Sequence, residues 1–310
     1  MANYREPESQ KSLAGAIKEY VASKEHEFKQ DYISRPQLAR IRWDLKRLQE
    51  HFAARSVAEL TVSNLVAFLE LGQPALKTYN NRRGIVATFL KFAFLRGWIA
   101  DNPILRVPHH RIRLRHGMAK TLTAAQAAAL MEHFEGFEGG RWVPYFALCL
   151  FAGIRPGVPD GEIRKLRPEA VDLEAGVISI SAEVSKVREP RRVTIQPNLA
   201  AWLKAYPLEK FPIVVGNFQQ RRAKFAKKFG LTHDVLRHTF ISMFVAKFRS
   251  LGEAAIQAGN SESIIRRHYL DLKSAAEAEK FFGILPRQAK GSAMEAAVFP
   301  MPSPALRVAV

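Results

Sequence analysis

The chain has 310 residues, of which 47% are hydrophobic and 10% aromatic, enough for two packed domains and too apolar for a disordered polymer. Lys and Arg total 47 against 29 Asp and Glu, so the formal net charge of +18 predicts a polyanionic partner, with nucleic acid favoured over an anionic membrane surface. The single cysteine, Cys149, excludes an intrachain disulfide and cysteine-based four-ligand zinc sites, and no apolar run is long enough to span a bilayer.

Residues 1–105 are predicted to form a helical domain. Between positions 34 and 53, apolar residues recur at spacings of three and four, which predicts one buried helix face made of Leu38, Ile41, Leu45, Leu48 and Phe52. Shorter helices are expected over 11–21 and 61–71. A long fourth helix is expected over 75–98, before Pro103, with a core stripe of Ile85, Phe89, Phe92 and Leu95. Four helices of this size form a small bundle.

Residues 106–120 are basic, contain a proline and a glycine, and lack a helical stripe. We predict an interdomain linker that lies along a DNA backbone, with phosphate contacts from Arg111, Arg113 and Arg115. The histidines of this segment lack the carboxylate or thiolate partners of a metal site, so no metal is expected. On the preceding helix, Lys77, Arg82 and Arg83 are candidates for phosphate or groove contacts; a solvated helix face is the alternative.

Residues 121–286 are predicted to form the second domain. Thr123 and Gln126 make a capping-box pattern, and an apolar helix is expected over 142–152. The alternating, β-branched segments 177–184 and 191–196 predict a hairpin that turns at 186–190. The pattern is helical again from 197 to 283, and residues 287–310 are predicted to be a flexible tail. The expected fold class is therefore mainly α with a small antiparallel β-hairpin or sheet.

The chemistry-bearing residues lie at the boundaries of these elements. The sequence lacks a phosphate loop of the GxxxxGK[ST] type, so nucleotide hydrolysis is not expected. Arg155 follows the apolar helix, Lys186 lies at the hairpin turn, Arg237 lies near a helix start, and Tyr269 ends the segment SESIIRRHY. Each residue alone has an ordinary interpretation as a surface charge, a solvated turn lysine or a packed tyrosine.

Together, the order and context of these residues resemble the tyrosine recombinases, the phage-integrase-like family. The resemblance rests on Gly153-Ile154-Arg155, on Lys186 in a hairpin, on the run Leu236-Arg237-His238-Thr239-Phe240, and on Gly259-Asn260 followed by Tyr269 nine residues after Asn260. It covers roughly residues 10–285. It implies a helical core-binding bundle followed by a mixed α/β catalytic domain.

The resemblance also implies a reaction. Tyr269 would attack a DNA phosphodiester to give a 3′-phosphotyrosyl link, Arg155 and Arg237 would stabilise the charge on the phosphate oxygens, and Lys186 would act as general acid toward the leaving 5′ oxygen. The enzyme would be a site-specific DNA recombinase or integrase that needs neither a metal, nor ATP, nor another cofactor. It would act on duplex DNA as a homotetramer on two sites, in the cytoplasm with the nucleoid.

Several positions depart from the family pattern. Asp234 stands where a histidine is usual, with His233 one residue earlier, and Asn260 replaces the usual His or Trp. His268 is a possible substitute, and Glu162, which follows an insertion, matches an acidic residue that steadies the arginine–lysine site. Three alternatives stay open: a recombinase-like protein that binds DNA without cutting it, a nicking-closing enzyme similar to type IB topoisomerases, and a basic protein that binds RNA or a membrane surface.

Overall fold

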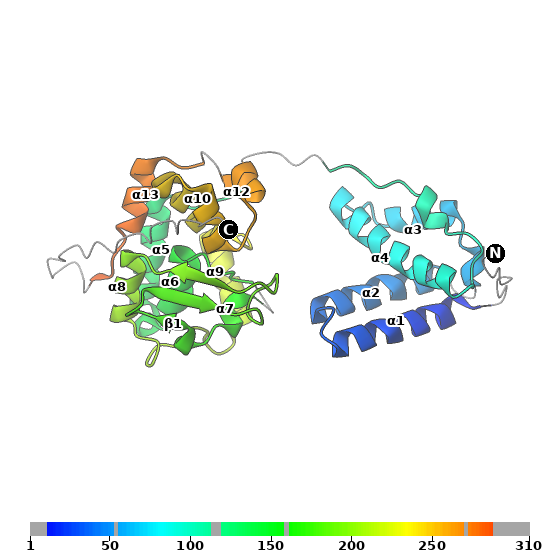
Figure 1. The fold of residues 1–310 in the computed structure, drawn as a ribbon, viewed down its shortest axis with the longest axis horizontal. Coiled ribbons are helices and arrows are strands. Elements are labelled where there is room, and N and C mark those ends of the chain that lie inside the picture. The colour runs from blue at the N-terminus through cyan, green and yellow to red at the C-terminus, as the bar shows by residue number, and fades with distance from the viewer. Residues whose placement is uncertain (1–10, 53–54, 113–118, 158–160, 270–271, 288–310) are drawn as a thin grey trace, which may run out of the picture. The chain divides into compact units, whose positions relative to one another are not determined.

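The structure is a computed structural model that describes residues 11–52, 55–112, 119–157, 161–269 and 272–287. The chain divides into two compact units, Met1–Leu114 and Arg115–Val310 (Figure 1). Both units are mainly helical, and the second also contains a small antiparallel sheet, which confirms the predicted fold class. None of the helices in the described part of the chain combines the length and the hydropathy that a bilayer crossing needs.

Helices α1, α2 and α3 of unit 1 begin at polar capping residues, whereas the N-cap of α4 is Ala75. The side chains of Ser12, Ser34 and Thr61 each accept a hydrogen bond from a main-chain N–H in the first turn of the helix that follows. Apolar faces then pack α1 on α2 and α4, and α3 on α4. The described helices of this unit are α1 Leu13–Lys29, α2 Arg35–His51, α3 Val62–Glu70 and α4 Leu76–Leu95, with short 3₁₀ helices at Val57–Glu59 and Pro103–Arg106.

The buried face of α4 differs from the predicted stripe. Phe89 is fully buried as expected, but Leu95 is 73% exposed, and Ile85 and Phe92 are only partly buried. The buried positions are Tyr79, Arg82, Val86, Phe89, Leu90 and Ala93. The helix is therefore rotated by about one residue from the predicted orientation, because a buried arginine, which the apolar pattern does not count, shares the core face.

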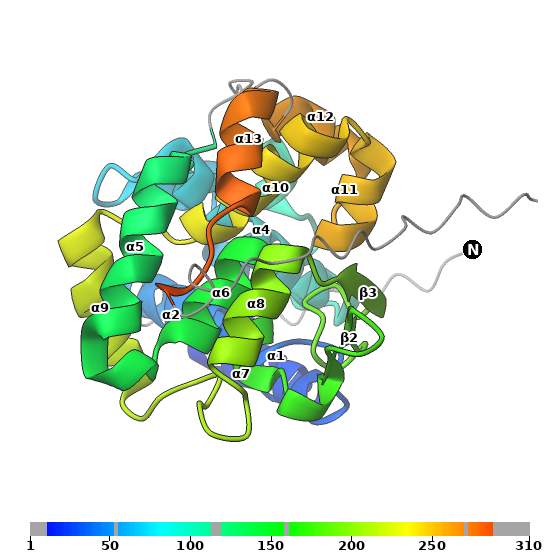
Figure 2. The ribbon, with the colours of Figure 1, turned by 90° about the vertical axis from the view of Figure 1, so that its left-hand side faces the viewer.

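Unit 2 is built around two central helices, α6 Val143–Phe151 and α10 Val235–Phe248. Every residue of α6 is buried, and α10 packs against α6, α11 and α13. Figure 2 shows α13 between α5 and the α10–α12 region, and α13 contacts both α5 and α10. The other helices of the unit are α5 Ala124–Gly136, α7 Glu162–Lys165, α8 Pro197–Ala205, α9 Phe218–Phe229, α11 Leu251–Ala258, α12 Glu262–Tyr269 and α13 Ala275–Phe282. The capping box at Thr123 and Gln126 is confirmed at the start of α5.

The sheet has three antiparallel strands in the order β1-β2-β3, formed by Val171–Asp172, Val177–Ile180 and Arg191–Thr194. The register of β2 and β3 pairs Ile180 with Arg191 and Ile178 with Val193. The predicted hairpin is therefore present, but its strands are shorter and its connection longer than expected, and β1 is an additional strand. Arg191 consequently lies at the first paired position after the connection.

The end of the described chain is fixed to α5. Arg287, the first residue of the predicted tail, donates through its main-chain N–H to a Glu135 carboxylate oxygen at 2.8 Å, and its Nη2 donates to Glu132 at 2.7 Å. The predicted tail beyond Arg287, residues 288–310, lies outside the described residues.

Gly153 sets the distance between the two central helices. It follows α6 with φ +63°, and a Cβ built on it would lie 2.4 Å from Cδ1 of Phe240 on α10. We therefore expect Gly153→Ala to lower the free energy of unfolding by about 3 kcal/mol, because overpacking and left-handed strain act together. Urea denaturation measures the loss.

Gly176→Ala is the matched control for this substitution. Gly176 has a similar φ of +67° but no atom within 4 Å of the added Cβ, so only the backbone strain of about 1–2 kcal/mol applies. Equal losses in the two variants would contradict the close approach of α6 and α10 at Gly153.

Candidate active site

The Arg155 side chain enters the site directly after α6. The helix is wholly buried, and the left-handed Gly153 turns the chain so that Ile154 remains in the core while Arg155 is 17% exposed. Its Nη2 donates to Oδ1 of Asn260 at 3.1 Å and to the Gly259 carbonyl at 3.4 Å. This guanidinium therefore has one side in the protein and one side open to solvent.

Arg237 lies deeper, in the first turn of α10. Its Nη1 donates to the Gly153 carbonyl at 2.6 Å, and its Nη2 donates to the Ala258 carbonyl and to Oδ1 of Asn260, the latter at 3.4 Å. Burial, together with the neighbouring positive charge of Arg155, lowers the pKa of Arg237 to about 9. The surroundings therefore disfavour the positive charge of Arg237, and a bound anion would stabilise that charge.

Asn260 joins the two arginines. Gly259 ends α11 in the left-handed conformation, and the Asn260 main-chain N–H returns to the Ala255 carbonyl, which directs the amide side chain into the site. Its Oδ1 accepts from both Arg155 and Arg237. An amide at this position orients guanidinium groups but cannot transfer a proton.

Glu162 is the buried acid of the cluster. The main-chain N–H of Arg155 donates to its Oε2 at 3.2 Å, and Nη1 of Arg155 lies 3.5 Å from its Oε1. Burial alone would raise the pKa of Glu162, but hydrogen bonds and charge from Arg191, followed by the charges of Arg237 and Arg155, hold it below its usual value. The structure therefore brings Glu162, predicted with less weight, into contact with the central arginine.

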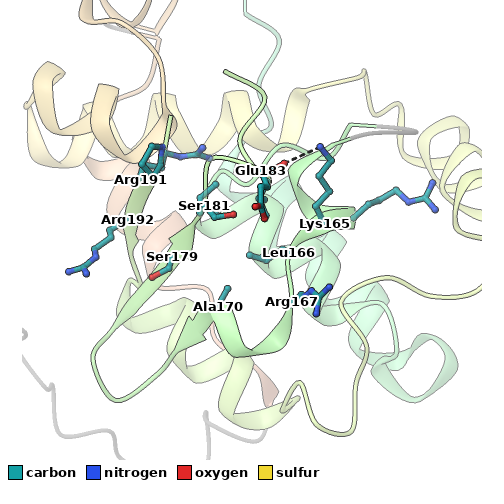
Figure 3. A pocket seen from close by; sticks show the side chains of 13 residues that line it. Lys165, Leu166, Arg167, Ala170, Ser179, Ser181, Glu183, Arg191 and Arg192 are labelled. Atoms are coloured by element: carbon teal, nitrogen blue, oxygen red, sulfur yellow. Dashed lines mark hydrogen bonds between the residues drawn. The ribbon is translucent and has the colours of Figure 1, made fainter. Parts of the chain in front are cut away.

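Arg191 is not among the residues predicted from the sequence. Its Nη1 and Nη2 donate to the two oxygens of Glu162 at 3.0 and 2.6 Å, a bidentate pair with side chains only 6% and 0% exposed. The adjacent Arg192 is exposed and points the other way (Figure 3). Successive side chains of a strand point to opposite faces, so the two arginines point in different directions. From the sequence, only the pairing register of the strand would have shown which of them faces inward.

Arg192 borders a basic hollow beside the sheet. The hollow has a volume of about 1000 Å³, and Lys165 closes part of it by donating to the Glu183 carbonyl at 3.1 Å (Figure 3). Its other charged lining residues include Arg164 and Arg167. Arg191 and Arg192 both line this hollow, but only Arg191 also reaches the buried carboxylate of Glu162.

In the cluster of Arg155, Arg191 and Arg237, three guanidinium groups surround the carboxylate of Glu162: Arg155 and Arg191 contact it, and Arg237 acts on it through its charge. Positive charge in excess of its partners is costly when it is removed from water. Guanidinium groups bind phosphate oxygens through parallel hydrogen bonds. The arrangement is therefore suited to a phosphate group that approaches from the exposed side of Arg155.

Tyr269 is the last residue of α12 and is 6% exposed. Its ring meets that of His238 edge to face, with centroids 5.6 Å apart. Burial raises the pKa of Tyr269, while the charge of Arg237 acts in the opposite direction. The hydroxyl is therefore protonated at neutral pH, and its deprotonation requires an acceptor.

Two histidine rings lie beside this tyrosine. His238 Nδ1 is buried and has no hydrogen-bond partner among the described residues, and burial lowers the pKa of His238, which favours its neutral form. The His268 ring is farther away, with a centroid distance of 6.4 Å. His238 belongs to the run Leu236–Phe240 but is not among the predicted site residues. Its ring contact with Tyr269, which only the structure shows, makes it a candidate.

The other predicted residues lie at the edge of the cluster. His233 is 68% exposed and its Nδ1 lies 3.1 Å from Oδ1 of Asp234, the residue at the N-cap of α10. Lys186 is exposed in the β2–β3 connection, and among the described residues its ammonium group forms no hydrogen bond or ion pair with Glu162 or Asn260. The structure therefore unites Arg155, Glu162, Arg237 and Asn260, but not Lys186 or His233.

Two of the arginines predicted to contact DNA are used inside unit 1. Arg82 is 3% exposed, its Nη1 donates to the carbonyls of Phe68 and Leu69, and its Nε lies 3.8 Å from Asp44. Arg83 donates to the carbonyls of Ile104 and Val107 at 3.0 Å. These placements give both side chains structural roles and argue against phosphate contacts by them.

The remaining predicted contacts are on the surface or outside the description. Lys77 and Arg111 are exposed, whereas Arg113 and Arg115 lie outside the described residues. Trp43, 48% exposed on α2, has the guanidinium groups of Arg40 and Arg47 over its ring at 4.9 and 4.7 Å. This arginine–aromatic group was not predicted, because the pattern of α2 directs attention to its apolar face.

No group of three or more His, Cys, Asp or Glu side chains suited to a metal ion is found among the described residues. Cys149 is fully buried in α6, and burial raises the pKa of its thiol, so it is a core residue and not a reactive one. Among the described residues of this unit, the side chains available for chemistry therefore include the arginines, Glu162, Asn260, the histidines, Lys186 and Tyr269.

Comparison with protein-family models and with curated protein sequences finds no match. Solved structures, in contrast, are similar over most of the chain. A lambda integrase tetramer bound to a Holliday junction matches with a TM-score of 0.66 at 14% identity, over 84% of this chain and 78% of that one.

Two further structures match in the same way. A lambda integrase dimer bound to a COC′ core site has a TM-score of 0.64 at 14% identity, and the alignment covers 82% of this chain and 95% of the integrase fragment. A Tn1549 transposon integrase in complex with a circular intermediate DNA has a TM-score of 0.62 at 14% identity, over 89% and 100% of the two chains. The chain therefore has the fold of these integrases.

Proposed function

We propose, from a fold shared with lambda integrase and Tn1549 integrase, that this protein is a site-specific DNA recombinase or integrase that cuts and rejoins duplex DNA through a 3′-phosphotyrosyl intermediate. The observation that carries the proposal is the pair formed by the buried Arg237 and the partly exposed Arg155, which Asn260 links and which carries more positive charge than Glu162 balances. Tyr269, whose pKa responds to both arginines, stands beside it.

The reaction follows from these positions. The Tyr269 oxygen attacks phosphorus as the bond from phosphorus to the 5′ oxygen breaks, so one phosphoester replaces another and no nucleotide cofactor is consumed. Arg155 and Arg237 stabilise the charge that develops on the non-bridging oxygens. The phenol proton passes to a neutral acceptor, for which we favour His238, and Lys186 protonates the leaving oxygen when DNA is bound beside the β2–β3 connection.

The same proposal extends to assembly and location. The similar lambda integrase structure contains a tetramer on a Holliday junction, which supports a homotetramer on two DNA sites for this chain. The net charge of +18 supports binding to duplex DNA, and we place the protein in the cytoplasm with the nucleoid. Lys77, Arg111 and the Arg40–Trp43–Arg47 group, in which Arg40 also pairs with Asp44 and Arg47 is partly exposed, are the candidates for phosphate contacts in unit 1.

Covalent trapping on a nicked suicide substrate tests the proposal. Candidate sites are taken from the DNA that flanks the gene, and the products are separated on a denaturing gel. A slower protein–DNA band that yields phosphotyrosine on hydrolysis is the expected result. Tight binding on native gels without any adduct across these sites would instead favour a DNA-binding protein that does not cut, and relaxation of plasmids lacking such sites would favour a nicking-closing enzyme.

Lys186→Ala should slow cleavage by about 10²–10⁴-fold while DNA binding stays nearly intact, because a general acid acts only on the leaving group. Single-turnover cleavage of the suicide substrate measures the rate. A substrate with sulfur in place of the leaving 5′ oxygen should restore the rate, since a thiolate leaves without a proton. Lys204→Ala, which removes an exposed lysine from α8, is the charge-matched control. Loss of DNA binding in Lys186→Ala would contradict the assignment.

A further inference from the structure

Arg191 and Glu162 form a buried ion pair directly behind the site arginine. The two guanidinium nitrogens of Arg191 occupy both carboxylate oxygens, at 3.0 and 2.6 Å. Nη1 of Arg155 reaches the same carboxylate only at 3.5 Å. Glu162 therefore makes its strong bidentate contact with Arg191 and only a long contact with the side chain of Arg155.

The position of Arg191 is set by main-chain and side-chain contacts to α11. Its Nε donates to the Gln257 carbonyl at 3.2 Å, and the Gln257 side chain accepts from the Thr194 N–H at 2.8 Å. A Cβ on Gly259 would lie 3.1 Å from Cδ of Arg191, so the side chain packs closely against the residue that precedes Asn260. Arg191 thus joins β3, Glu162 and the Gly259–Asn260 turn.

Competition for Glu162 decides where the Arg155 guanidinium points. A buried carboxylate without Arg191 would have Arg155 as its nearest side-chain cation, and bidentate pairing with it would be the strongest bond available. Arg155 would then turn from Asn260 toward Glu162. Its N–H groups would then donate to the Glu162 carboxylate and would no longer be available to bind a phosphate.

We propose that Arg191 is a positioning residue which, by occupying Glu162, keeps the Arg155 guanidinium on Asn260 and free to bind a phosphate. The inference rests on the proposed function for its biological setting. The inference itself concerns only whether the Arg155 guanidinium can bind an anion, and this can be measured without strand cleavage.

Inorganic phosphate is the probe, and the Nε–H signal of Arg155 in ¹⁵N-labelled protein is the readout. Wild type should show a phosphate-dependent shift of this signal. Arg191→Ala should weaken the apparent phosphate affinity about tenfold, the equivalent of one charge-assisted hydrogen bond. The double variant Arg191→Ala with Glu162→Gln should recover most of that loss, because the competing charge is gone.

Control variants separate positioning from folding. Arg192→Ala, the neighbour on the opposite face of β3, should leave the Arg155 titration unchanged. Should Arg191→Ala fail to fold, Arg191→Lys takes its place, since a single ammonium cannot form the fork and should give a smaller loss of the same sign. Urea denaturation establishes that each variant is folded.

The outcomes separate the inference from the proposed function. No phosphate shift of Arg155 in wild type, an unchanged affinity in Arg191→Ala, or a double variant no better than the single one would each overturn the positioning role. If the titrations agree with expectation while no DNA adduct forms with wild type, the positioning role stands and the proposed strand-transfer activity fails. Suicide-substrate cleavage by the same four proteins should follow the order of their phosphate affinities.

Discussion

Tyr269→Phe should abolish the covalent protein–DNA adduct while leaving DNA binding and folding close to wild type. The substitution removes the one oxygen that attacks phosphorus but keeps the ring, which packs edge to face on His238. The Tyr269 side chain is only 6% exposed, and its hydroxyl forms no hydrogen bond with the described residues. Removing the hydroxyl should therefore have little effect on the packing of the core. Denaturing gels on the suicide substrate and native gels on intact duplex measure the two properties side by side.

Tyr32→Phe is the control for this experiment. Tyr32 is 74% exposed in unit 1, and its hydroxyl has no place in the proposed chemistry, so the adduct should form at the wild-type rate. An adduct that survives in Tyr269→Phe would assign the nucleophile to another residue and would remove the basis for the recombinase proposal.

The second large effect is expected for Arg155→Ala. Loss of one donor group that stabilises the transition state costs about 3 kcal/mol, so cleavage should fall by about 10²–10³-fold. Arg155 is the better choice than Arg237, because Arg237 donates to the carbonyls of Gly153 and Ala258 and its removal would leave them unpaired in the core. Single-turnover cleavage under saturating protein measures the effect on chemistry apart from binding.

Chemical rescue makes the Arg155 prediction specific. Millimolar guanidinium, far below denaturing concentrations, should restore part of the rate in Arg155→Ala by entering the space next to Asn260, but should not affect wild type. Arg141→Ala, an exposed arginine that precedes α6, is the charge-matched control and should cleave normally. Wild-type cleavage by Arg155→Ala would contradict its proposed contact with the phosphate.

The sequence predicts the residues of the site better than their environment. Arg155, Arg237 and Asn260 belong to short motifs that can be identified in the sequence without knowing the fold. The structure brings these three side chains into contact. Arg191 and Arg192 are neighbours in one alternating segment, and the sequence pattern does not indicate which of the two side chains faces inward. That choice depends on the pairing of Ile180 with Arg191, a tertiary property of the hairpin.

Unit 1 illustrates the opposite error. Arg82 and Arg83 were expected on a DNA-facing helix surface because charged side chains are usually solvated. Asp44 on α2 and the carbonyl ends of α3 provide Arg82 with buried partners, and those partners are more than ten residues away in sequence. Asp44 also forms a closer ion pair with Arg40, and the burial of Arg82 accompanies the rotated face of α4 that leaves Leu95 exposed.

The carbonyl groups that receive Arg237 lie at the ends of two core segments, Gly153 after α6 and Ala258 in the last turn of α11. The Arg237 side chain of the site is therefore part of the same cooperative folding unit as the interior of unit 2. Heating should disrupt the site and unfold unit 2 in the same transition, and amide protons around Gly153 should exchange with solvent only when unit 2 opens globally. A phosphate that reaches this site would therefore meet positive charge that folding has already put in place.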